Sequence, residues 1–133
     1  MVIYVIMANF NSIIDSILQY EGGYVNDKDD AGGETFRGIA RNCNKDWEGW
    51  KIIDAYKTNN PKDFKQLLMK DMKLLKLVKD CYKRNYWDTL NLDNEPSQRV
   101  ANDIFDMAVN AGVSTAKKLY NKVKVKTEKY KKK

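Results

Sequence analysis

The stretch Glu21-Gly22-Gly23-Tyr24-Val25-Asn26-Asp27-Lys28-Asp29-Asp30-Ala31-Gly32-Gly33-Glu34-Thr35 is the centre of organisation of this 133-residue chain. It holds five carboxylates, four glycines and one threonine within fifteen residues. Because glycine accepts positive φ without penalty, the two glycine pairs predict breaks in regular structure. Polar, turn-rich loops between ordered elements are common places for binding and catalytic groups. The stretch therefore predicts a functional loop that begins where a helix ends, at Glu21.

The residues before Glu21 have the pattern of an amphipathic helix. Asn9 or Asn11 can cap its start, and Gly22 with Gly23 ends it. Glu21 follows Leu18 by three residues, so it faces roughly the same way as the apolar side of this helix. Partial loss of hydration favours the protonated form of a carboxyl group, which suits a general acid. The alternative is a helix-end carboxylate that bends back to solvent. Five apolar residues recur at spacings of three and four and form the apolar side: Phe10, Ile13, Ile14, Ile17 and Leu18.

The composition excludes several kinds of catalytic site. The chain has no histidine, which rules out a Ser-His-Asp triad, a Cys-His pair and every histidine-ligated metal site. Its two cysteines, Cys43 and Cys81, form no CxxC pair, and we expect both to be reduced thiols. Carboxylate chemistry is the main option that remains.

The acidic loop also invites comparison with a calcium site. An EF-hand that started at Asp27 would place Ala31 at its fifth position and Gly38 at its twelfth, and neither supplies the needed ligand. We therefore expect no metal site. Asp27 and Asp29 are expected to cap turns, as aspartate side chains commonly do.

Three segments resemble one known family. They are Glu21–Asp27 with the following Gly32–Thr35 and Gly38-Ile39; Tyr82 with Tyr86-Trp87-Asp88; and Phe105–Gly112. Together they are similar to the glycoside hydrolase family 108 lysozymes, which are phage endolysin and autolysin-like N-acetylmuramidases. The resemblance runs from about Met7 to Ala116.

The resemblance implies a mostly α-helical, lysozyme-like domain with a small β-hairpin or irregular catalytic loop near residues 24–40. It implies hydrolysis of the β-1,4 bond between N-acetylmuramic acid and N-acetylglucosamine in peptidoglycan, a bacteriolytic activity that needs no cofactor. Glu21 matches the catalytic glutamate and would protonate the leaving oxygen. The second carboxylate is Asp30 or Glu34, and Thr35 would help to position water. The spacing to Thr35 is one residue shorter than is usual in phage lysozymes.

Elementary chemistry supports the same assignment. Glycoside hydrolysis usually needs two carboxyl groups in different environments, one protonated and one ionised. A partly buried Glu21 beside a wet, acidic loop offers that contrast.

Candidate substrate contacts are Tyr24, Asn26, Arg37, Trp87, Asp106 and Asn110. Charge balance is the alternative for Arg37 and Arg41, capping is the alternative for Asp106 and Asn110, and core packing is the alternative to sugar stacking for Trp47 and Trp50.

Charge is divided unevenly along the chain. Residues 1–56 carry five basic and nine acidic groups, and residues 57–133 carry nineteen and nine. A basic body around an acidic loop suits a polyanionic partner such as a bacterial cell wall. The lysines at 62–79 fan around helices, so we expect a solvated face there and no nucleic-acid partner. The sequence does not indicate an oligomeric state.

The ends of the chain carry expectations of their own. The apolar run at residues 1–6 is too short for a signal peptide or a membrane span, so we expect synthesis in the cytoplasm and action on the wall after release. Residues 7–116 are expected to form the catalytic domain. Relatives in the family usually continue further, so the lysine-rich tail 117–133 is interpreted as the remnant of a peptidoglycan-binding region.

Three other functions stay open at the level of sequence. One is a related glycan enzyme, either a chitinase or a lytic transglycosylase. Another is a truncated, inactive module that binds the cell wall. The third is a nucleic-acid binder, which a salt-dependent shift assay would reveal.

Overall fold

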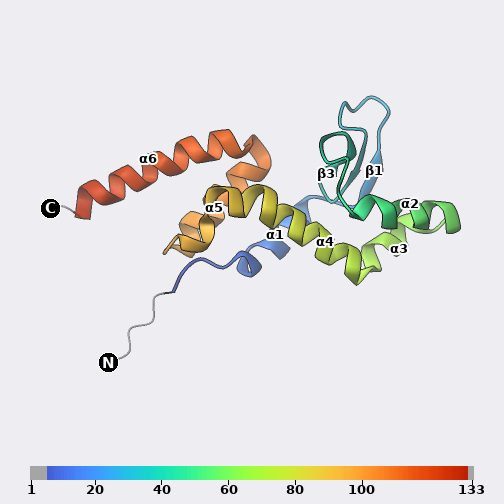
Figure 1. The fold of residues 1–133 in the computed structure, drawn as a ribbon, viewed down its shortest axis with the longest axis horizontal. Helices are drawn as coiled ribbons and strands as arrows, with labels where there is room; N and C mark the ends of the chain where they lie inside the picture. Colours follow the sequence, from blue (N-terminus) through green and yellow to red (C-terminus); the bar gives the residue numbers. More distant parts are fainter. Residues whose placement is uncertain (1–5, 132–133) are drawn as a thin grey trace. The chain divides into compact units, whose positions relative to one another are not determined.

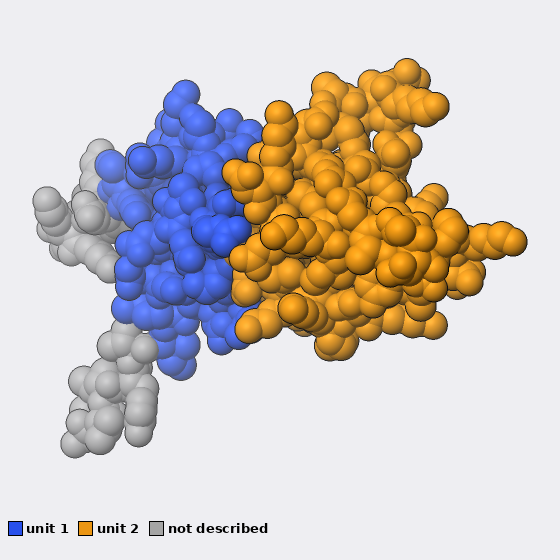
Figure 2. Space-filling view, turned by 45° about the vertical axis from the view of Figure 1, so that its right-hand side comes forward, with its two compact units in different colours: residues 1–13, 83–133 blue, residues 14–82 orange. Residues whose placement is uncertain are grey.

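The computed structural model describes the backbone of residues 6–131 and the side chains of residues 6–126. Most of the described chain is helical, and it contains one small antiparallel sheet (Figure 1). This confirms the predicted fold class, including the β element near residues 24–40. The chain forms two compact units, residues 14–82 and residues 1–13 with 83–133 (Figure 2). The apolar run at residues 1–6 lies, apart from Ile6, outside the described residues.

The unit of residues 14–82, unit 2 in Figure 2, contains a helix, the sheet and four further helical segments. α1 (Ile14–Tyr20) leads into a sheet with the strand order β1-β2-β3. Tyr24 pairs with Phe36 across β1 and β2, and Phe36 pairs with Ile39 across β2 and β3. The strands are β1 (Tyr24–Asn26), β2 (Glu34–Phe36) and β3 (Ile39–Ala40), and the later helices are η2 (Arg41–Cys43), α2 (Gly49–Asn59), α3 (Phe64–Lys70) and α4 (Met72–Tyr82).

The helix predicted from residue 10 onward begins later than expected. Residues Phe10–Ser12 form a short 3-10 turn, η1, and regular α1 starts only at Ile14. Asn9 caps the 3-10 turn as predicted, since its Oδ1 accepts a hydrogen bond from the Asn11 backbone N–H at 2.9 Å. Ile14, Ile17 and Leu18 are buried, so the apolar face of the helix is as predicted from its spacing.

Trp47 and Trp50 belong to the core of this unit. Their rings meet edge to face with centroids 5.2 Å apart, and both side chains are buried. The indole N–H groups donate to the backbone oxygens of Leu77 and Asn44, at 3.2 Å and 2.8 Å. Of the two readings left open by the sequence, core packing is the one that the structure supports.

The unit of residues 1–13 and 83–133, unit 1 in Figure 2, is built on an aromatic cluster. Phe10, Trp87 and Phe105 pack edge to face, with ring centroids 5.6 to 5.7 Å apart. A π-helical turn carries Trp87, which permits its ring to point fully inward. The elements are η1, the π-helix η3 (Lys83–Trp87), η4 (Asp88–Leu90), η5 (Leu92–Asn94), α5 (Gln98–Ala111) and α6 (Val113–Lys131).

The last helix, α6, packs on α5 through its first turns. Ala116 and Tyr120 are buried, and the Tyr120 hydroxyl donates to Glu95 Oε1 at 2.8 Å. Burial and the hydrogen bond to Glu95 both raise the pKa of Tyr120. α6 is continuous across residues 116 and 117, where the sequence suggested the start of a tail. Within the described residues, no helix is both long and apolar enough to cross a membrane.

Candidate active site

Glu21 lies at the end of α1, where the sequence placed it. Gly22 adopts a φ of +65°, which ends the helix, and the Glu21 backbone N–H still donates to Leu18 O at 3.3 Å. The side chain is partly buried. Its Oε2 lies only 2.6 Å from the point where a Cβ on Gly38 would stand. The carboxyl group therefore rests directly against the backbone at Gly38.

The turn that contains Gly38 joins β2 to β3 and is strained. Arg37 and Gly38 form a two-residue hairpin turn with φ values of 46° and 83°, the pattern of a type I′ turn. A non-glycine residue in this region costs about 1–3 kcal/mol and persists only where its surroundings hold it. Strained residues of this kind gather at functional sites, and this one adjoins Glu21.

Arg37 is held mainly through its backbone. Its N–H donates to Gly23 O at 3.1 Å, and its carbonyl accepts from the Tyr82 hydroxyl at 2.5 Å. The Nε is buried and has no hydrogen-bond partner within the described part of the chain. Burial lowers the pKa of the guanidinium, and the Tyr82 hydroxyl opposes that effect. The buried Nε is therefore out of reach of a ligand, and any ligand contact by Arg37 would use the other guanidinium nitrogens.

We expect Arg37→Asn to raise stability while it lowers activity. Asn-Gly is the preferred pair for a type I′ turn, so the substitution should relieve about 1 kcal/mol of strain and raise Tm by roughly 4 °C. Thermal unfolding and catalytic turnover would be measured together. Arg37→Ala is the matched variant, because it removes the guanidinium and keeps the unfavourable backbone. An unchanged or lower Tm for Arg37→Asn would contradict the claim that the backbone at Arg37 is strained.

Glu34 lies in a network of opposite charges. Oε2 accepts from the Tyr24 hydroxyl at 2.5 Å and from Lys57 Nζ at 2.8 Å. Oε1 accepts from Arg41 Nη1 at 3.1 Å, and Arg41 also makes two bonds of 2.8 Å to the Asp54 carboxylate. Burial alone would raise the pKa of Glu34, but the hydrogen bonds from Lys57 and Tyr24 outweigh it and the pKa is lowered. Both oxygens of Glu34 are therefore occupied within the protein.

This network predicts a loss of stability in acid. The folded-state pKa of Glu34 lies below its ordinary value of 4.5. The stabilisation of the folded state by Glu34 is therefore present above that pH, and it is lost as the pH falls through the folded-state pKa. We expect Tm to fall less steeply below about pH 4.5 in Glu34→Gln than in the wild type. Calorimetry between about pH 3 and 6 would measure both slopes. Equal slopes would show that Glu34 adds nothing to the pH dependence.

Asp30 has a different environment from Glu34. It is exposed, and its Oδ1 accepts the Gly32 backbone N–H at 2.9 Å. Asp27 makes the same kind of turn with the Asp29 N–H at 2.9 Å, which confirms the capping predicted for Asp27. Asp30 thus keeps a solvated carboxylate on the loop between β1 and β2.

The remaining candidates of this unit lie on the strands. Thr35 Oγ1 donates weakly to Val25 O across the sheet, at 3.5 Å. Asn26 is exposed and pairs with Glu34 in the strand register. Tyr24 packs its ring edge to face on Phe64, with centroids 5.1 Å apart. Tyr24 on β1 thus contributes one of the contacts that hold Glu34, while Thr35 points to the opposite face of the sheet.

Three candidates lie in the other unit. Trp87 is fully buried against Phe10 and Phe105, and its indole N–H donates to Asp93 Oδ1 at 2.8 Å. Asn110 Nδ2 donates to the backbone and side-chain oxygens of Asp106, at 2.9 Å and 3.1 Å, and both side chains are exposed. The ring faces of Trp87 are therefore covered by protein. Asp106 and Asn110 form a local pair on one side of α5.

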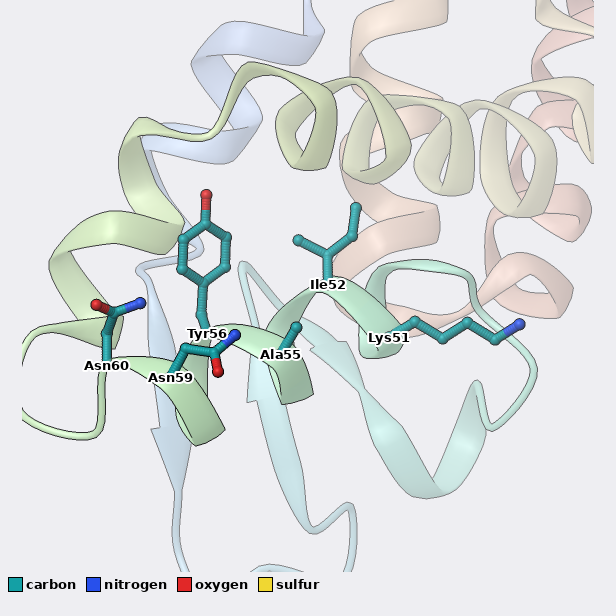
Figure 3. A pocket seen from close by; sticks show the side chains of 6 residues that line it. All are labelled: Lys51, Ile52, Ala55, Tyr56, Asn59 and Asn60. Carbon is teal, nitrogen blue, oxygen red and sulfur yellow. The ribbon is translucent and has the colours of Figure 1, made fainter.

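A separate hollow of about 390 Å³ lies along α2 (Figure 3). Ile52 and Tyr56 project into the same space from that helix, and Tyr56 donates to Asp71 Oδ2 at 2.7 Å. None of the candidate active-site residues lines it. The lining residues are Lys51, Ile52, Ala55, Tyr56, Asn59 and Asn60.

Comparison with known proteins gives a single finding. The model of the family Glycosyl hydrolase 108 matches residues 14–112, which include Glu21, the acidic loop and the Arg37–Gly38 turn. Neither the curated proteins nor the solved structures contain a match to the chain. The matched segment covers well over half of the sequence, and the chain accordingly belongs to the glycosyl hydrolase 108 family, as a glycoside hydrolase that acts on a glycan.

Proposed function

We propose that this glycoside hydrolase cleaves peptidoglycan at the β-1,4 bond between N-acetylmuramic acid and N-acetylglucosamine. The observation that carries the proposal is the family match across residues 14–112, with Glu21 at a glycine-ended helix inside it. The three sequence segments that resemble the family's lysozymes add the bond specificity. Glycan substrates with anionic groups also suit a chain with a net charge of +6.

Glu21 is proposed as the general acid. Its carboxyl group is partly buried against the Arg37–Gly38 turn, a setting in which one proton can be held and delivered to the leaving glycosidic oxygen. Developing positive charge on the sugar ring then needs a nearby anion. A general acid of this type supplies about 10²–10⁴-fold of rate.

Asp30 is proposed as the second carboxylate. Its exposed carboxylate can orient water or stabilise charge, and among the described residues its side chain contacts only the Gly32 backbone N–H. Glu34 is the weaker candidate, because Tyr24, Lys57 and Arg41 already occupy both of its oxygens. Thr35 is proposed to assist in placing water, and Arg37 to contact a polar or anionic group of the glycan.

Product analysis would test the proposal. Purified peptidoglycan and chitin would each be incubated with the wild-type protein, and new reducing ends would be identified by mass spectrometry. We expect muramic-acid reducing ends from peptidoglycan and little release from chitin. Anhydro ends without new reducing ends would indicate a lytic transglycosylase. Chitin cleavage would indicate a chitinase, and binding without cleavage an inactive module.

A further inference from the structure

Tyr82 connects the end of α4 to the turn beside Glu21. The side chain is 2% exposed, and its hydroxyl donates to the Arg37 carbonyl at 2.5 Å. The two residues are 45 positions apart in sequence, so the contact forms only when the helices pack on the sheet. A phenylalanine at this position would fill the same space without the hydrogen bond, so the role of the hydroxyl can be separated from the packing of the ring.

The same hydroxyl and the Glu21 carboxyl converge on one point. The position that a Cβ on Gly38 would occupy lies 2.6 Å from Glu21 Oε2 and is also in contact with Tyr82 Oη. A real Cβ would force both oxygens to move. Only the hydrogen of glycine leaves room for the two oxygens, so Gly38 is required by space as well as by its φ of 83°.

The strained turn needs anchors on both sides. The Arg37 N–H is bound to Gly23 O, two residues after Glu21, and the Arg37 carbonyl is bound to Tyr82. One anchor therefore belongs to the loop that carries Glu21, and the other belongs to α4. Without the second anchor, the turn can relax away from the carboxyl group that rests on it.

We propose that Tyr82 is a positioning residue, whose hydroxyl holds the Arg37–Gly38 turn against the Glu21 carboxyl group and so fixes the direction in which that group faces its substrate. The proposal rests on the proposed role of Glu21 and deepens it. Misplacement of a reacting group by about 1 Å can cost up to 10²-fold in rate, so an anchor that is remote in sequence can matter for turnover.

Tyr82→Phe tests the hydroxyl, and Tyr56→Phe is the matched control. Tyr56 also donates one tyrosine hydrogen bond, to Asp71 in the same unit, but it does not touch the turn. We expect similar falls in Tm for both variants. We expect kcat to drop about 10-fold for Tyr82→Phe with KM unchanged, and to stay within about two-fold for Tyr56→Phe. Equal kcat values for the two variants, or a rise in KM alone, would overturn the proposal.

Gly38→Ala provides a second test, with Gly112→Ala as its control. Gly112 also has a positive φ, of 95°, but a Cβ there would meet nothing within 4 Å. Both variants carry backbone strain, and only Gly38→Ala pushes on Tyr82 and Glu21. We expect a loss of kcat near 10²-fold for Gly38→Ala and none per folded molecule for Gly112→Ala. Equal effects would overturn the proposal.

A spectroscopic measurement separates this proposal from the proposed function. In NMR spectra of the isotope-labelled full chain, Tyr82→Phe should shift the Gly38 amide and Glu21 carboxyl resonances, and Tyr56→Phe should leave them in place. Those shifts without any wall cleavage by the wild type would refute only the muramidase function. Cleavage by the wild type with unmoved resonances would refute only the positioning role.

Discussion

Glu21→Gln is expected to lower the release of reducing ends from peptidoglycan by at least about 10²-fold. The amide keeps the size of the side chain but has no acidic proton to give to the leaving oxygen. Because Glu21 is only partly buried and Gln can still make hydrogen bonds, Tm should change little. Initial rates on purified peptidoglycan and a thermal melt of the same preparations would measure both quantities.

Asp15→Asn is the control for this substitution. Asp15 lies on α1, the helix that Glu21 directly follows, with a side chain that is 76% exposed and paired to Lys79 at 3.0 Å. The substitution makes the same carboxyl-to-amide exchange at an exposed ion pair, and such pairs contribute little, so activity and Tm should stay near the wild-type values. A Glu21→Gln protein that is folded and keeps more than about a tenth of wild-type activity would contradict the general-acid role.

Glu21 illustrates what sequence reasoning can supply. The pair Gly22-Gly23 and the spacing of Ile17 and Leu18 are local signals, and they located the end of α1 and the partly buried carboxyl correctly. The same holds for the capping by Asn9. Such features depend on a few neighbouring residues, so the pattern alone defines them.

Contacts between distant residues had no such signal. Lys57 meets Glu34 from 23 positions away and Arg41 bridges to Asp54 on α2, and sequence spacing alone does not relate these residues. Arg41 was expected either to balance charge or to contact substrate, and the structure gives it the first role. Trp87 was predicted as a candidate substrate contact, but its ring is buried and lies on a π-helical turn. A helical wheel does not show this departure from α periodicity.

Asp30→Asn and Glu34→Gln are expected to separate catalysis from stability. Asp30→Asn removes the charge but keeps an Oδ1 that can accept the Gly32 N–H, so the loop should hold its shape. We expect turnover to fall by about 10²-fold with Tm unchanged, since a carboxylate that stabilises the transition state is lost. Asp27→Asn is the matched control, because Asp27 makes the same turn contact in the same loop.

Glu34→Gln should have the opposite effect. Its side chain is 16% exposed, and the partners Lys57 and Arg41 are each 33% exposed. The variant leaves Lys57 without its anion and leaves Arg41 with Asp54 alone. The expected cost is about 2 kcal/mol, or a fall in Tm of roughly 5–10 °C, with turnover per folded molecule largely retained. The reverse outcome, a stable but inactive Glu34→Gln beside an active Asp30→Asn, would make Glu34 the second carboxylate. Substrate binding would then have to draw Lys57 or Arg41 away from it, because an anion saturated by cations cannot also stabilise charge on a sugar ring.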